Sequence, residues 1–241
     1  MRTAMQIAYG VYTYVVFATL GTAALIAVLA LPGVGRRRVI ARGAARAFLR
    51  MAGMRLEVRG LDRLPAGQCV VVANHASYLD GLVLTAALPP RFGFVIKREM
   101  ARVPLAAALL QRIGAEFVER FDRNKGAADA RRVLRKATTG QSLVFFPEGT
   151  FSSQPGLLKF HAGAFLAAAR AGCPVVPAAV RGTREALPPG RAVPRATPIS
   201  VELLSAVAAS AQDSGAAVTE LRERARQAIL HHLAERDLAA A

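Results

Sequence analysis

The sequence predicts an α/β domain with a mostly parallel sheet flanked by helices, preceded by an N-terminal membrane helix and an amphipathic basic helix. Three observations predict this fold. Short apolar runs alternate with helical patterns through most of the 241 residues. Arg2 is the one charged residue before position 36, and an arginine repeat follows. We expect residues 1–53 to form the membrane-associated segment and residues 54–241 the α/β domain.

Composition restricts the partners. The formal net charge of +16 and the pI near 11.4 suit nucleic acid, an anionic membrane surface or an acidic carrier protein. Residues 1–56 contain no acidic side chain, and their arginines follow an apolar stretch. Tryptophan is absent and aromatic content is 6%, so a base-stacking platform is poorly supported. We therefore expect an anionic membrane surface as a partner, and no nucleic acid.

The cysteines and histidines do not predict a metal site. Cys69 and Cys173 lie inside apolar runs, where a reduced and buried thiol is the usual state. Two such cysteines with four scattered histidines give no metal-ligand spacing. We expect no metal and no cofactor.

The apolar N-terminal stretch predicts a membrane helix. Residues 8–31 would span roughly 36 Å as a helix, enough for the hydrocarbon core. A cleaved signal peptide would have a shorter apolar region. Arginines 36–38 should stay cytoplasmic, which places the domain that follows on the cytoplasmic side of the cell membrane. A re-entrant helix in one leaflet remains open, because the stretch contains three helix-breaking residues, Gly10, Gly21 and Pro32.

The next element is an amphipathic basic helix. Four arginines recur at every fourth position, opposite a set of apolar residues on the same helical wheel. This pattern suits an anionic lipid surface; the alternative is a core-packed helix with a solvated basic face. The arginines are Arg38, Arg42, Arg46 and Arg50, and the apolar residues are Ile40, Ala44, Ala47, Phe48 and Met51.

The remaining chain alternates strands and helices. Short apolar runs predict strands at residues 54–58, 69–73, 93–96, 115–118, 142–146, 174–180 and 199–203. Amphipathic patterns predict helices at residues 79–88, 104–113, 125–137, 161–170 and 219–238. Residues 209–217 are expected to form a polar linker before the last helix.

The strand at 69–73 leads into the stretch that organises the chain. His75 follows it, at the edge where open α/β sheets bind ligands. Ser77 is the expected N-cap of the next helix, with Asp80 in its first turn. There the Asp80 carboxylate can reach the imidazole, fix its tautomer and make His75 a general base. In the alternative interpretation, Asp80 only caps its helix and His75 is an ordinary loop residue.

A second polar loop, residues 147–150, follows the strand at 142–146 and should open on the same sheet edge. With this loop in place, the chain resembles the 1-acylglycerol-3-phosphate (lysophospholipid) acyltransferases. The resemblance covers about residues 55–205 and rests on four ordered blocks: Asn74-His75 with Asp80, Gly114 to Arg120, Phe146 to Thr150, and Val175 to Pro177.

The resemblance implies a membrane-bound enzyme that moves a fatty acyl chain from acyl-CoA or acyl-carrier protein to a lysophospholipid. The expected acceptor is lysophosphatidate, and the product phosphatidate. His75 is expected to act as the general base, and Asp80 to orient its imidazole. Arg120 is implied to bind the acceptor phosphate, and Glu148 and Gly149 its glycerol portion, although residues 148–150 also suit a simple tight turn.

Three further residues are candidates for substrate binding. Thr150 belongs to a turn that can present backbone N–H groups to an oxyanion or phosphate. Asn74 directly precedes the proposed base. Lys97 follows the strand at 93–96 and can bind phosphate or the donor, though a lysine there is also an ordinary surface charge.

One residue departs from the family pattern. The third block usually continues with arginine, and this chain has Phe151 instead. An acceptor with another head group is therefore an alternative. A membrane-anchored thioesterase or hydrolase is a further one, because water can replace the hydroxyl acceptor.

Overall fold

A single seven-stranded sheet forms the centre of the computed structural model, which describes residues 2–119, 123–209 and 214–239. The order across the sheet is β1-β7-β6-β2-β5-β3-β4. All neighbouring pairs are parallel except β6 and β7, so the predicted mostly parallel sheet is confirmed. The strands are β1 (Leu56–Arg59), β2 (Val70–Ala73), β3 (Gly93–Lys97), β4 (Glu116–Val118), β5 (Leu143–Phe145), β6 (Val175–Arg181) and β7 (Ile199–Leu203).

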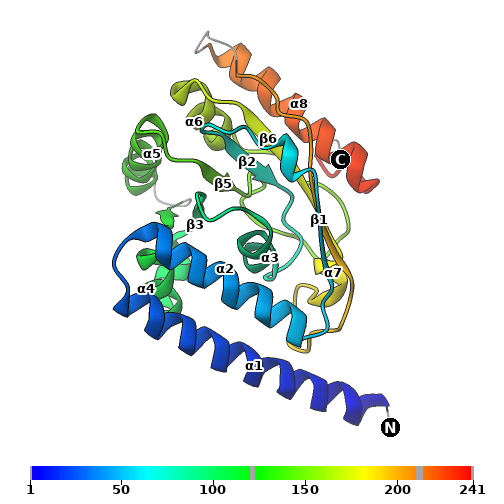
Figure 1. Cartoon of the computed structure of the whole chain (residues 1–241). Coiled ribbons are helices and arrows are strands. Elements are labelled where there is room, and N and C mark those ends of the chain that lie inside the picture. Colours follow the sequence, from blue (N-terminus) through cyan, green and yellow to red (C-terminus); the bar gives the residue numbers. More distant parts are fainter. Residues whose placement is uncertain (1, 120–122, 210–213, 240–241) are drawn as a thin grey trace.

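Helices cover both faces of the sheet (Figure 1). One core cluster joins α2 and α3 to the sheet, and the other joins α5, α6 and α8 to its opposite face. β2 is buried along its whole length because it contributes side chains to both clusters. The helices are α1 (Arg2–Ala30), α2 (Val34–Met51), α3 (Asp80–Ala87), α4 (Pro104–Arg112), α5 (Arg123–Thr138), α6 (Gly163–Ala171), α7 (Thr183–Ala186) and α8 (Gly215–Leu233).

The predicted strands and helices are found, with differences at the C-terminal end. Helix α8 begins inside the expected linker, because the Ser214 hydroxyl caps it by accepting from the Ala217 N–H. It ends at Leu233, where Ala234 adopts a left-handed conformation. The short elements η1 (Leu61–Arg63), η2 (Arg98–Arg102) and α7 were not predicted, since three to five residues carry too little periodicity.

The first two helices form a hairpin laid against the domain. Helix α1 runs unbroken through Gly10 and Gly21, and Pro32 falls in the turn to α2. Figure 1 shows α1 as the outermost layer, with α2 between it and the sheet. The Tyr9 hydroxyl donates to the Ala52 carbonyl at 2.7 Å, so the start of α1 is tied to the end of α2.

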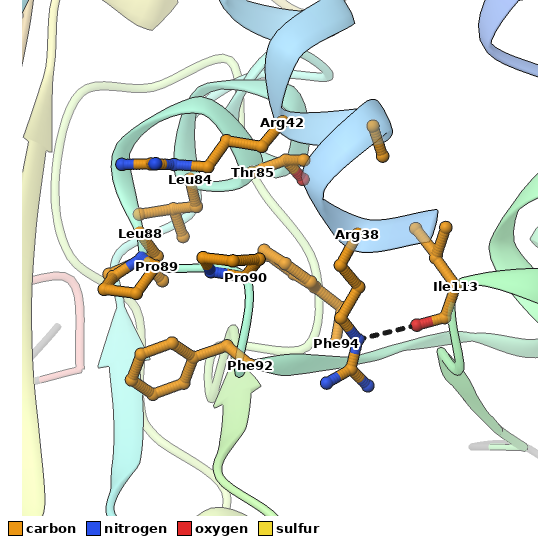
Figure 2. Close-up of a pocket in the computed structure, with 11 residues that line it drawn as sticks. Arg38, Arg42, Leu84, Thr85, Leu88, Pro89, Pro90, Phe92, Phe94 and Ile113 are labelled. Carbon is orange, nitrogen blue, oxygen red and sulfur yellow. Dashed lines mark hydrogen bonds between the residues drawn. The ribbon is translucent and has the colours of Figure 1, made fainter. Parts of the chain in front are cut away.

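The arginine repeat of α2 is not a single exposed stripe, because some of its arginines bind backbone carbonyls of the domain; binding of this helix to anionic lipid stays a prediction. Arg38 Nε donates to the Ile113 carbonyl at 2.8 Å, and Arg46 Nε donates to the Ala86 carbonyl at 2.8 Å. Arg42 also points toward the end of α3 (Figure 2). The physical reason is that the last carbonyls of α3 lack helical partners and carry the negative end of its dipole. Arg50 remains exposed.

Arg38 is the most enclosed of these arginines. Its guanidinium lies between α2 and the start of β3, where Nη1 donates to the Arg91 carbonyl at 2.9 Å. Figure 2 shows its hydrogen bond to the carbonyl of Ile113, in a pocket that Phe94 also lines. Burial lowers the pKa of the Arg38 guanidinium. Arg38 therefore holds the hairpin to the sheet domain.

We expect Arg38→Ala to destabilise the fold. The variant loses two hydrogen bonds from a charged donor and leaves two carbonyls without a partner. The free energy of unfolding should fall by about 2 to 4 kcal/mol. Thermal unfolding of the full chain in neutral detergent measures the loss. Arg36→Ala is the matched control, because Arg36 is exposed on the same helix. Equal melting temperatures for both variants would contradict this role.

Candidate active site

The Asp80 carboxylate is the centre of the site. Its Oδ2 atom accepts hydrogen bonds from His75 Nδ1 at 2.8 Å, Ala76 N–H at 2.6 Å and Ser77 N–H at 2.8 Å. The Asp80 side chain is fully buried, in the first turn of α3. The predicted contact between Asp80 and His75 is therefore present, and the start of the helix favours the negative charge.

Ser77 is not the N-cap that the sequence predicted. Helix α3 begins at Asp80, with Leu79 in the cap position. Ser77 Oγ accepts from the Leu79 N–H at 3.2 Å and donates to the Leu187 carbonyl at 2.7 Å. The contact from the Ser77 N–H to Asp80 is one half of a capping box, so the motif orders the loop although the helix starts later.

The His75 ring lies between aromatic side chains. It stacks on Phe146 with ring centroids 4.3 Å apart, and the edge contact with Phe151 has centroids 4.5 Å apart. Tyr78 packs edge-on against Phe151. The His75 side chain is 19% exposed. Since Nδ1 is bonded to Asp80, Nε2 is the ring nitrogen that can take a proton from a substrate.

Glu148 joins the two loops of the site. Its Oε1 atom accepts from the His75 N–H at 2.6 Å, and Oε2 accepts from the Leu158 N–H at 2.8 Å. Burial raises the pKa of Glu148 to about 7, although these two N–H groups act to lower it. Both carboxylate oxygens therefore position backbone, a role that the sequence did not indicate.

Gly149 and Thr150 form the turn after Glu148. Gly149 has φ +75°, which glycine adopts without strain. Its N–H donates to the Phe146 carbonyl at 3.0 Å, so this donor closes the turn instead of facing a substrate. Thr150 is exposed.

Asn74 bridges two strands beyond their last paired residues. Its Nδ2 donates to the Val180 carbonyl at 2.9 Å, and its Oδ1 accepts from the Val180 N–H at 2.8 Å. Asn74 is 4% exposed. The amide therefore fixes where the His75 loop leaves β2, and a part in substrate binding stays a prediction.

Lys97 lies at the same sheet edge as His75. It ends β3 and is aligned with Val118 of β4. Because β5 separates β3 from β2, Lys97 is about 10 Å from the β2 strand. Arg120, the predicted phosphate ligand, lies outside the described residues.

A cluster that the sequence analysis missed supports the segment before Arg120. Asp129 Oδ2 accepts from the Glu119 N–H at 2.9 Å and from Arg98 Nε at 3.1 Å. Burial raises the pKa of Asp129, but these hydrogen bonds and those from Arg132 lower it to about 2. The three-residue spacing of Asp129 and Arg132 on α5 is the sequence pattern that could have predicted this ion pair.

Arg226 supports the other loop and was also missed. It is 3% exposed and donates to the Leu157 carbonyl at 3.0 Å and the Leu158 carbonyl at 3.1 Å. Its ion pair with Asp237 compensates the buried charge. Arg226 thus braces the segment that Glu148 binds.

The described residues contain no group of three or more histidine, cysteine or acidic side chains that suits a metal ion. Cys69 and Cys173 are free and buried, and burial raises the pKa of both thiols.

Comparison with known proteins identifies similar chains. The sequence model of the Acyltransferase family matches residues 55–181. The chain is 34% identical over 136 residues to the chloroplastic 1-acyl-sn-glycerol-3-phosphate acyltransferase BAT2 of Brassica napus, covering 56% of this chain and 39% of the relative. It is 33% identical over 145 residues to a lyso-ornithine lipid O-acyltransferase of Pseudomonas aeruginosa, covering 58% and 54%. The matches thus span about half or less of these relatives.

A solved structure has the same fold. The crystal structure of the 1-acyl-sn-glycerophosphate acyltransferase PlsC from Thermotoga maritima superposes with a TM-score of 0.79, covering 97% of each chain at 21% identity. The hairpin and the sheet domain are therefore both part of a known architecture.

We expect Asp80→Asn to lower the acyl-transfer rate by about 10²-fold while the protein stays folded. The asparagine oxygen can replace Oδ2, and its NH₂ group can occupy the place of Oδ1, which forms no hydrogen bond in the described chain. The charge that stabilises an imidazolium is then lost. Steady-state kinetics measure the effect, with Asp62→Asn at an exposed position as control. An Asp80→Asn variant as active as wild type would reduce Asp80 to a cap.

Glu148 predicts a pH dependence of stability. Its folded pKa of about 7 lies above the ordinary 4.5, so between these values the folded protein holds a proton that the unfolded chain has lost. Wild-type stability should fall as pH rises through this window, relative to Glu148→Gln, which does not titrate. The slope is at most about 1.4 kcal/mol per pH unit. Melting temperatures of both proteins from pH 4.5 to 7.5 test this, and parallel curves would contradict it.

Proposed function

The chain belongs to the acyltransferase family, and we propose that it transfers a fatty acyl chain from an acyl thioester to the free hydroxyl of lysophosphatidate, giving phosphatidate. The observation that carries the proposal is the His75–Asp80 pair, held at 2.8 Å at the carboxyl edge of a parallel sheet. The acyl donor is acyl-CoA or acyl-carrier protein.

The proposed chemistry is direct attack by the acceptor. His75 Nε2 takes the proton from the acceptor hydroxyl as its oxygen attacks the thioester carbonyl. The tetrahedral intermediate collapses, the C–S bond breaks, and the thiol leaves with the proton returned by His75. Asp80 stabilises the imidazolium in between, as the carboxylate of a hydrolase triad does. A serine nucleophile is not needed, because the acceptor hydroxyl takes its place.

Residues at the same edge are proposed to bind the acceptor phosphate. Lys97 ends β3 at this edge. Arg120, which lies outside the described residues, is proposed as the main ligand of the phosphate from the family pattern. A guanidinium suits phosphate oxygens because it donates two parallel hydrogen bonds. Glu148, Gly149 and Thr150 shape the adjoining turn and place the glycerol portion of the acceptor.

A different head group is the second candidate, and Phe151 favours it. The ring stands where the family usually has arginine, and it packs directly against His75. One relative of this chain is named for a different acceptor, a lyso-ornithine lipid. We favour lysophosphatidate because the other three blocks match and Arg120 is present.

We propose that α1 lies in the membrane interface on the cytoplasmic side. Its residues 4–30 are long and apolar enough to cross a membrane, with mean hydropathy 2.0. However, the hydroxyls of Tyr12 and Tyr14 donate to the carbonyls of Met51 and Ala192, and α1 also contacts α4. A helix fixed sideways along its length suits a position within one leaflet better than a spanning one.

Mass spectrometry of products tests the function. Purified full-length protein given acyl-CoA and a panel of lysolipids should form phosphatidate from lysophosphatidate. His75→Ala should reduce this rate by about 10²- to 10⁴-fold. His231→Ala is the control, since His231 is exposed on α8. Thioester hydrolysis that no lysolipid alters would instead indicate a thioesterase, and a His75→Ala variant with more than a tenth of the wild-type rate would remove the proposed base.

Phe151 provides a test of the acceptor. If lysophosphatidate is the acceptor, Phe151→Arg should be tolerated or lower its KM, because a guanidinium adds charge-assisted hydrogen bonds to phosphate. Phe151→Leu removes the ring without adding charge and separates the two effects. Steady-state kinetics on lysophosphatidate and on a neutral-head-group lysolipid give the answer. A wild-type preference for the neutral lipid, lost in Phe151→Arg, would favour the other acceptor class.

A further inference from the structure

A cleft lined by arginines lies away from His75. The end of α2 and the start of β1 border a half-open cleft of about 330 Å³, which we call the arginine cleft. Its lining includes three arginines, Arg46, Arg50 and Arg55, above an apolar floor formed by Leu49, Met54 and Leu56. The volume is of the size that binds small molecules.

The arginine cleft has positive charge that the protein does not neutralise. In the part of the chain that the structure describes, no acidic side chain forms an ion pair with Arg46, Arg50 or Arg55. Glu57 is close to Arg55 in sequence, but its carboxylate pairs with Arg59 at 2.7 Å. Arg46 Nε is already bonded to the Ala86 carbonyl. Among the described residues, Arg50 and Arg55 are the lining guanidinium groups that no hydrogen bond or ion pair holds, and they favour a bound anion.

The chemistry of the lining selects the class of anion. Guanidinium forks match phosphate oxygens, and the apolar floor suits the carbon atoms attached to a phosphate ester. Leu49 is 2% exposed and Met54 is 1% exposed, because both belong to the hydrophobic core beneath the cleft. Leu56 and Val58 are half-buried, so they are the apolar lining residues that a ligand can still contact.

The position of the arginine cleft indicates a lipid source. The Tyr9 and Tyr12 hydroxyls of α1 donate to the carbonyls of Ala52 and Met51, which lie between the cleft residues Arg50 and Met54. Neighbouring helices lie about 8 to 10 Å apart, so the cleft is one helix diameter behind the apolar face of α1. If α1 lies in the interface as proposed above, the arginines reach the level of lipid phosphates.

The same register separates the cleft from the acyl-transfer site. Leu56 is aligned with Ile199, and β7 and β6 place it beyond the carboxyl end of β2. Two strands lie between β1 and β2, so the strands are about 14 Å apart. The cleft therefore faces the same edge as His75 without being part of that site.

We propose that the arginine cleft binds the phosphate head group of an anionic membrane phospholipid, which holds the catalytic edge against the bilayer. This inference rests on the proposed interfacial position of α1. It does not depend on which acceptor is acylated, because the lipid is bound and not converted.

Native mass spectrometry of the full chain in neutral detergent tests the proposal. With equal amounts of phosphatidylglycerol and phosphatidylcholine added, one phosphatidylglycerol should be retained per chain. Arg50→Gln/Arg55→Gln should weaken that binding about 30-fold, since each basic residue near anionic lipid raises the affinity about fivefold. Arg59→Gln/Arg224→Gln removes the same charge at exposed positions elsewhere and should bind as wild type.

Three results would overturn the proposal. Equal retention of both lipids would exclude an anionic site, and equal losses in the two double variants would indicate a general charge effect. Displacement of the lipid by adenosine 3′,5′-bisphosphate at comparable concentration would identify a soluble nucleotide as the occupant. Acyl transfer measured in the same detergent should be unchanged in Arg50→Gln/Arg55→Gln, so a failure here is distinguishable from a failure of the proposed function.

Discussion

The site depends on one buried carboxylate oxygen. Asp80 Oδ2 holds the His75 imidazole and the N–H groups of Ala76 and Ser77 at the same time. Removing a carboxylate from water is costly unless hydrogen bonds compensate, and here three donors and the start of α3 do so. The hydrogen bonds that Asp80 Oδ2 accepts therefore also fix the loop and the tautomer of His75. Catalytic geometry and local stability are the same set of interactions.

A second buried carboxylate extends this arrangement to the neighbouring loop. Glu148 accepts from the backbone N–H groups of His75 and Leu158. Arg226 donates to the Leu158 carbonyl and so holds the same segment. The His75 loop is thus held before substrate arrives, with aromatic rings on two sides that keep the imidazole partly dry. Such preorganisation reduces the rearrangement needed in the transition state. It also explains why residues expected to touch substrate, such as Asn74 and Glu148, have contacts with backbone.

The sequence predicted the sheet and the catalytic pair because both depend on local patterns. Uniformly apolar runs such as 70–73 indicate strands buried on both faces, and Asp80 needed only a helix start to reach His75. The Arg38 contact with Ile113 could not be predicted, since it joins residues 75 positions apart and depends on how α2 docks. The same holds for Arg226, because a periodic helix pattern does not show that one arginine on it is buried against a distant loop. Polar contacts across the fold require the packed structure, whereas hydrophobic periodicity is already present in the chain.

His75 is proposed to activate the acceptor hydroxyl for direct attack, without an acyl-enzyme. Initial rates measured over a grid of acyl-CoA and lysophosphatidate concentrations test this most directly. Direct attack requires both substrates on the enzyme together, so double-reciprocal plots should intersect. Parallel lines, with release of free CoA from acyl-CoA before any acceptor is added and in an amount equal to the enzyme, would show a covalent acyl-enzyme and contradict the account.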